Sequence, residues 1–107
     1  MASFYKNAKV DLTSTDVTTL YTAPAATTAI FRSLMVADDS GSTSTITVTL
    51  TDSASAVFVL YSVKATVASA TVELLTQPLV VQESEILKVT AANANRLHVI
   101  GSYLEIT

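Results

Sequence analysis

Few residues of this 107-residue chain have the types and spacing that enzyme chemistry requires. His98 is the single histidine, and a Ser-His-Asp arrangement is formally possible because serines are abundant. However, no nucleophile-elbow sequence is present, and a lone histidine in a strand more often has a structural role. Metal binding through His98 would need further ligands, which the sequence does not supply. We therefore predict no catalytic residue and no metal site.

Two pairs of carboxylates are the next candidates for chemistry. Asp38 and Asp39 lie beside Gly41, but their spacing does not match the alternating ligands of a calcium loop. Turn formation explains these residues, since Asp starts turns and Gly supplies positive φ. Glu83 and Glu85 could form an acid–base pair, but they fall in a turn before a strand, where a solvated or interface role is favoured. With no cysteine and no glycine-rich phosphate loop, we predict no enzyme and no cofactor.

Four tyrosines could contribute to a binding surface: Tyr5, Tyr21, Tyr61 and Tyr103. Aromatic rings on a β-sandwich can form a platform for sugars. Tyrosine is also common at protein interfaces, because its apolar ring carries a polar tip. We favour the interface interpretation and keep a carbohydrate-binding adhesion module as an alternative.

The elements that must position these residues are strands. The run TITVTLT at residues 45–51 alternates apolar residues with threonines. Successive side chains of a strand point to opposite faces, so Ile46, Val48 and Leu50 share one face and the threonines share the other. Such alternation is typical of a half-buried strand in an antiparallel sheet.

The rest of the chain has the same character, with no sustained helical period. We expect strands at residues 4–12, 17–22, 28–37, 45–51, 57–63, 71–75, 86–91 and 97–106, and a short apolar piece at 79–81. About eight short strands separated by turns predict one all-β domain over residues 1–107, an antiparallel β-sandwich or jelly roll. Residues 1–12 are an extended amino-terminal arm or the first strand. The strong turn at residues 38–42 predicts a hairpin between the strands at 28–37 and 45–51.

Some expected strands are apolar on both faces, and the second face must be covered by an arm, a loop or a neighbouring subunit. In the strand at 28–37, Ile30, Leu34 and Val36 are expected on one side, and Phe31 and Met35 on the other. The sequence does not decide which face is the core. The candidate interface residues are Phe4, Tyr5, Val10, Phe31, Met35, Phe58 and Leu60.

The composition points to a protein that is packed against neighbours. Only 14% of the residues are charged, against roughly 25% in ordinary soluble domains. A surface of Thr, Ser and Ala is easily desolvated, because few ions would have to be buried. The net charge is −3 and the six basic residues are scattered, so direct nucleic-acid binding is not expected. No signal peptide and no membrane-spanning apolar run is visible.

Three segments together resemble small structural proteins of tailed bacteriophages: TTLYTAP at 18–24, VADDSG at 36–41 and TITVTLTD at 45–52. VELL at 72–75, LVV at 79–81 and ILKV at 86–89 add to this resemblance, which covers most of the chain. It implies a virion component made in the host cytoplasm. The leading version is a capsid decoration, or cement, protein that forms homo-oligomers and clamps adjacent subunits of the major capsid protein. A tail, neck or fibre-attachment protein, bound to another virion protein, is the alternative. Residues 2–12 are the expected strand-exchange or lattice contact, since extended segments readily add to open sheet edges.

Overall fold

The computed structural model describes residues 2–107, and this part of the chain contains strands and no helix. Nine strands follow one another along the chain: β1 (Ser3–Leu12), β2 (Thr18–Thr22), β3 (Thr28–Asp38), β4 (Thr45–Thr51), β5 (Val57–Ala65), β6 (Thr71–Glu73), β7 (Leu79–Val81), β8 (Ile86–Ala91) and β9 (Leu97–Ile106). The prediction of an all-β domain is therefore confirmed. Residues 1–12 were expected to form either an extended arm or the first strand. The structure has a strand there, which pairs with β9 from Ser3 to Leu12.

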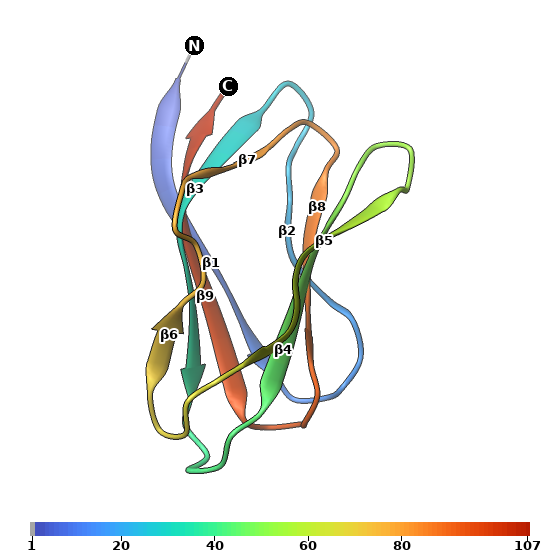
Figure 1. Cartoon of the computed structure of the whole chain (residues 1–107). Coiled ribbons are helices and arrows are strands. Elements are labelled where there is room, and N and C mark those ends of the chain that lie inside the picture. Colours follow the sequence, from blue (N-terminus) through green and yellow to red (C-terminus); the bar gives the residue numbers. More distant parts are fainter. Residues whose placement is uncertain (1) are drawn as a thin grey trace.

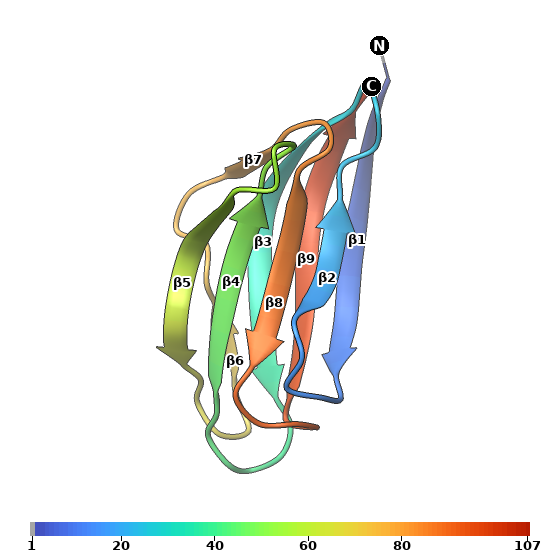
Figure 2. The same cartoon turned by 90° about the vertical axis from the view of Figure 1, so that its right-hand side faces the viewer.

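The strands form two antiparallel sheets that face each other (Figure 1). One sheet has the order β1-β9-β3-β6, with β7 also paired to β3, and the other has the order β2-β8-β4-β5. Figure 2 shows the second sheet in front, from β5 through β4 and β8 to β2. The pairs are nested in sequence: β4 with β5, β3 with β6 and β7, β2 with β8, and β1 with β9. One long double strand is thus folded over on itself, which is the arrangement of a jelly roll.

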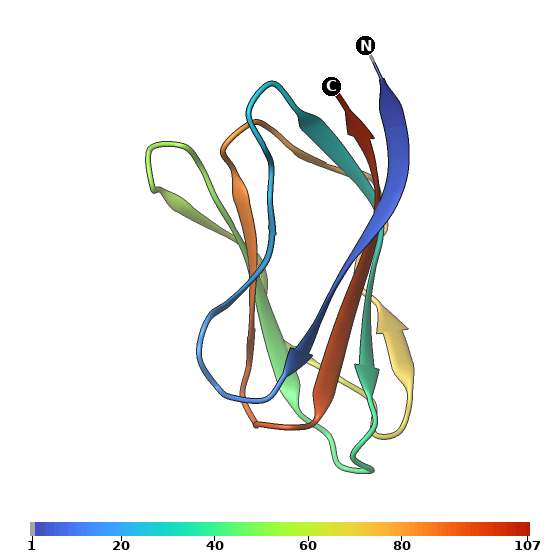
Figure 3. The ribbon, with the colours of Figure 1, turned by 180° about the vertical axis from the view of Figure 1, so that it is seen from behind.

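The nesting places both chain ends at the same end of the sandwich (Figure 3). The Ala2 and Thr107 backbones join them, because the Ala2 amide donates to the Thr107 carbonyl at 3.1 Å and the reverse bond is 2.9 Å long. Asp52 closes the β4–β5 hairpin, the innermost of the nested pairs. Its Oδ1 accepts hydrogen bonds from the amides of Ala54 and Ala56, both 2.9 Å long.

The hairpin expected between the strands at 28–37 and 45–51 is wrong, because β3 and β4 lie in different sheets. Residues 39–44 cross from one sheet to the other. Buried Asp38 anchors this crossover: its Oδ1 accepts from the amide and hydroxyl of Ser40, and its Oδ2 accepts from the hydroxyl of Thr66 at 3.3 Å. A turn signal in the sequence does not distinguish a return within one sheet from a passage to the facing sheet.

The predicted faces of β3 also need correction. The register with β9 shifts between Phe31 and Ser33, so Arg32 is an extra residue at a β-bulge. An extra residue reverses the alternation of side chains, and Phe31 therefore points inward together with Leu34 and Val36. Phe31 is wholly buried on the opposite face from Met35, which contradicts the expectation that the two share a face.

Three aromatic rings pack together between the two sheets. The centroids of Phe31 and Tyr103 are 4.8 Å apart in a stacked arrangement, and Tyr21 meets Phe31 edge-on at 5.3 Å. Gly101 lies on β9 directly beside this cluster, and its lack of a side chain leaves the space that the Phe31 ring fills. Aliphatic side chains from both sheets complete the core: Leu12, Leu34, Val36, Ile46, Val48, Val81, Leu87, Val89, Leu97 and Val99.

Thr51, the last residue of β4, is buried although its hydroxyl oxygen has no hydrogen-bond partner among the described residues. Burying an unpaired hydroxyl costs free energy that an isosteric methyl group does not. We expect Thr51→Val to raise the free energy of unfolding by about 1 kcal/mol, measured by urea denaturation. Thr49→Val on the same strand is the control, because that side chain is already partly exposed to water. Unchanged or reduced stability of Thr51→Val would contradict this prediction.

Candidate functional site

The residues that were weighed for chemistry, His98 and Glu85 among them, contact neighbouring side chains and turns. His98 lies partly exposed, with its Nε2 3.3 Å from Asp11 Oδ1 and 3.8 Å from Asp39 Oδ2. Glu85 accepts a hydrogen bond from the Gln82 amide at 2.7 Å and so stabilises its own turn. Between residues 2 and 107, no group of three or more His, Asp or Glu side chains is arranged to hold a metal ion. The same residues include no helix that is long and apolar enough to cross a membrane.

The seven candidate interface residues fall into three groups. Phe31 is in the core, and Val10 and Leu60 are partly buried against it. Met35 is partly buried on the outer face of β3. The remaining three side chains are more than half exposed, at 52%, 79% and 56%: Phe4, Tyr5 and Phe58. The structure thus leaves two exposed apolar surfaces, one on the β1-β9-β3 sheet and one on β5.

The first surface is a row of apolar side chains that crosses four strands. Tyr5 of β1 stands opposite Leu104 of β9, which stands opposite Ile30 of β3, which in turn stands opposite Val80 of β7. Residues directly opposite one another in antiparallel strands share a face, and this face is the one turned away from the core. We call these four residues the outer row. The sequence did not reveal it, because its members are far apart in the chain and belong together only through strand pairing.

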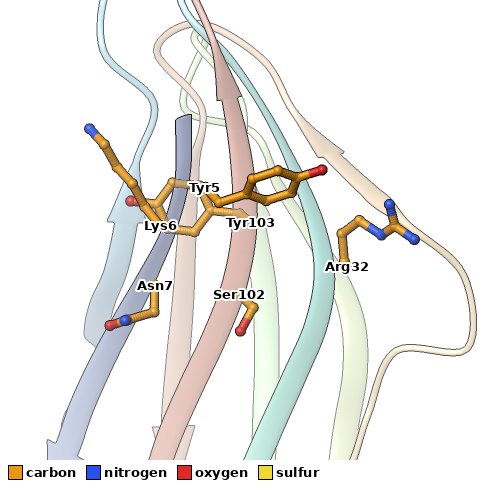
Figure 4. Close-up of a pocket in the computed structure, with 6 residues that line it drawn as sticks. All are labelled: Tyr5, Lys6, Asn7, Arg32, Ser102 and Tyr103. Atoms are coloured by element: carbon orange, nitrogen blue, oxygen red, sulfur yellow. The ribbon is translucent and has the colours of Figure 1, made fainter. Parts of the chain in front are cut away.

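A hollow of about 390 Å³ lies next to the outer row, lined by Tyr5, Lys6, Asn7, Arg32, Ser102 and Tyr103. Figure 4 shows the Tyr5 ring reaching from β1 across β9 toward β3, where Arg32 stands. Arg32 reaches this outer face because it is the extra residue of the bulge. Its guanidinium forms no ion pair with any residue that the structure describes. A tyrosine and an arginine side by side are typical of the residues that dominate binding energy at protein interfaces.

The second surface is the β5 strand at the end of the other sheet. Val57, Phe58, Val59 and Val63 are all more than half exposed, and Lys64 is the only charged residue of the strand. The register between β4 and β5 shifts twice, between Ile46 and Val48 and again between Val48 and Thr49. Bulges of this kind twist an edge strand and make it harder for another strand to add. We therefore expect β5 to contact a partner through its apolar side chains and not by backbone pairing with another strand.

A buried carboxylate ties the edge strands of both sheets to the centre. Glu105 of β9 lies almost wholly buried, and its Oε2 accepts a hydrogen bond from the Tyr21 hydroxyl at 2.6 Å. Its Oε1 accepts from Lys6 Nζ at 2.9 Å. These two hydrogen bonds hold the pKa of Glu105 below its usual value, and the bond to Glu105 raises the pKa of Lys6. Burial and the bond to Glu105 raise the pKa of Tyr21. The Glu105 carboxylate therefore stays ionised at neutral pH and links β9 to β1 and β2.

Glu105 carries only a weak signal in the amino-acid sequence and was not among the predicted site residues. The residue follows the inward-facing series Leu97, Val99, Gly101 and Tyr103 at the same spacing of two. That spacing indicates an inward carboxylate, but its partner Lys6 lies at the other end of the chain.

A search against models of known protein families and against curated protein sequences finds no match for this chain.

Proposed function

We propose that this chain is a non-enzymatic structural protein of a bacteriophage virion, most simply a decoration protein that binds the assembled capsid. The observation that carries the proposal is the outer row, an apolar stripe whose two end residues, Tyr5 and Val80, are exposed. Beside it stands Arg32, which forms no ion pair within residues 2–107. An apolar stripe with a tyrosine and an arginine fits a protein partner. The resemblance of the sequence to phage structural proteins favours the major capsid protein as that partner.

Decoration would act through mass action. A protein that binds the assembled lattice and not the free subunits stabilises the lattice by the free energy of binding. Many copies on one particle add their contributions. The low charge of the chain supports this role, because few ions have to be desolvated when its surface is covered.

Tyr5→Ala tests the capsid-binding surface. We expect this variant to bind capsids about thirtyfold or more weakly, because truncating a hot-spot tyrosine typically costs about 2 kcal/mol or more. Binding is measured by co-sedimentation with capsids that lack the protein. Val17→Ala is the matched control, since Val17 is 64% exposed in the segment between β1 and β2. Equal capsid binding by the wild type and Tyr5→Ala would contradict the assignment of the outer row to the capsid-binding surface.

A carbohydrate-binding role is the second candidate, and the hollow beside Tyr5 favours it. Its lining combines an aromatic ring with amide, hydroxyl and guanidinium donors from Asn7, Ser102 and Arg32. Saturable binding of a glycan that is lost in Tyr5→Ala, together with no binding to capsids, would favour this role over decoration. A tail, neck or fibre-attachment protein would instead bind a partner present in few copies per particle.

A further inference from the structure

The most regular free edge of the molecule is β1. Within residues 2–107 this ten-residue strand pairs with β9 alone, and its register runs without a shift from Ser3 to Leu12. It lies at the margin of its sheet, with no strand beyond it (Figures 2 and 3). The edge strands of the other sheet, β2 and β5, both carry register shifts. A long regular edge presents unpaired backbone donors and acceptors to any strand that can align with them.

The charges on β1 are arranged to fit a second β1. Lys9 and Asp11 are two residues apart, so both point to the outer face. The Lys9 ammonium has only a 3.5 Å contact with the Asn7 side-chain oxygen. The Asp11 Oδ1 lies 3.3 Å from Nε2 of His98 on β9, but 61% of the Asp11 side chain is exposed and can still meet a second cation. The third charged residue of the strand, Lys6, is engaged with Glu105. Lys9 and Asp11 are therefore available to a partner.

We propose that two copies of this chain associate through antiparallel pairing of their β1 strands, with the twofold axis at Val10. This register places Lys9 of each copy opposite Asp11 of the other and Ala8 opposite Leu12. Opposite charges directly across an antiparallel pair are stabilising, and like charges are destabilising. The interface is isologous, so each favourable pair occurs twice.

The charges also exclude the neighbouring registers. A shift that keeps the faces matched moves the axis by one residue along the strand. With the axis at Lys9 the two lysines are opposite each other, and with the axis at Asp11 the two carboxylates are opposite each other. A hollow of about 290 Å³ lies at this point of the outer face, lined by Lys9, Val10, Asp11, His98, Val99 and Ile100. It leaves room for the aliphatic stem of the lysine that arrives from the second copy.

This association goes beyond the proposed function and uses a different part of β1. Pairing around Val10 engages the carboxyl half of the strand, whereas Tyr5 and the outer row lie toward the other end. The sheet continues from one copy to the next with both outer faces on the same side. The dimer therefore presents two outer rows to one lattice, and bivalent attachment strengthens binding.

Charge variants test the dimer by sedimentation velocity over a range of protein concentrations. The wild type is expected to show a monomer–dimer equilibrium. Lys9→Asp should weaken dimerisation about tenfold or more, because two attractive pairs become repulsive. The double variant Lys9→Asp/Asp11→Lys restores the pairs in reverse and should restore the dimer. Lys64→Asp is the matched control, since it makes the same charge change on the exposed part of β5 and should leave the dimer intact.

A cysteine variant tests the position of the axis. The chain contains no cysteine, so Val10→Cys introduces a single thiol that meets its own copy across the twofold axis. We expect a disulfide-linked dimer under mild oxidation, and none from Val17→Cys. A wild type that stays monomeric at every concentration, or a dimer that Lys9→Asp leaves unchanged, would overturn the proposal. The proposed virion role does not depend on this result, so the dimer and the virion role can be refuted independently of each other.

Discussion

Gly101→Ala is expected to lower the free energy of unfolding by about 2 kcal/mol or more, because no space exists for a methyl group. A Cβ at Gly101 would lie 2.6 Å from Cε2 of Phe31, 3.0 Å from its Cδ2 and 3.5 Å from Cδ1 of Leu34. The phenyl ring cannot move aside freely, since it is stacked on Tyr103 and meets Tyr21 edge-on. Chemical denaturation measures the loss.

A double-mutant cycle separates this clash from a backbone effect. Phe31→Leu shortens the side chain that the new methyl group would strike, so Gly101→Ala should cost less in that background. Ser102→Ala is the control on the same strand, because its side chain is exposed and its substitution should change stability by less than about 0.5 kcal/mol. If Gly101→Ala unfolds at the same denaturant concentration as the wild type, the packing described for Phe31 is wrong.

Glu105→Gln is expected to cost about 2 kcal/mol of stability, because hydrogen bonds to a charged group contribute more than neutral ones. The amide keeps the size of the side chain but removes the charge that Lys6 faces, and it weakens the bond from Tyr21. Since Lys6 is half exposed, water replaces part of the lost attraction. Glu83→Gln is the control, because Glu83 is exposed in a turn.

The same carboxylate makes stability depend on pH. The pKa of Glu105 is lower in the folded chain than its ordinary value of 4.5, so the folded state favours the ionised form. Its contribution is fully present above the unfolded pKa and is lost as the pH falls through the folded pKa. Burial opposes ionisation of Asp38, but hydrogen bonds from Ser40 and Thr66 outweigh it and also lower that pKa. Melting temperatures below pH 5 should therefore fall more steeply for the wild type than for Glu105→Gln. Equal slopes would contradict the role given to Glu105.

The strands were predictable because their signal is local. The alternation at residues 45–51 corresponds to β4 with its inward Ile46 and Val48. The two predictions that failed, the hairpin between β3 and β4 and the face of Phe31, depend on pairing between distant segments. Nothing in the sequence around Arg32 signals a bulge, yet that one extra residue sends Phe31 into the core and Arg32 to the surface.

The candidate surfaces were predictable only in part, for the same reason. Exposure of Tyr5 and Phe58 agrees with their being candidate interface residues. The outer row requires knowing that β1, β9, β3 and β7 are neighbours in that order, and the turn at residues 38–42 suggested a different neighbour for β3. The nested pairing that brings residue 5 beside residue 104 is a property of the whole chain.

The most direct test of the proposed virion role is whether purified phage particles contain this protein, and in how many copies. Quantitative mass spectrometry would compare it with the major capsid protein. A decoration protein should be present at a number of copies comparable to that of the capsid subunit. A few copies per particle would move the protein to the tail or neck, and its absence from the particle would contradict the virion role.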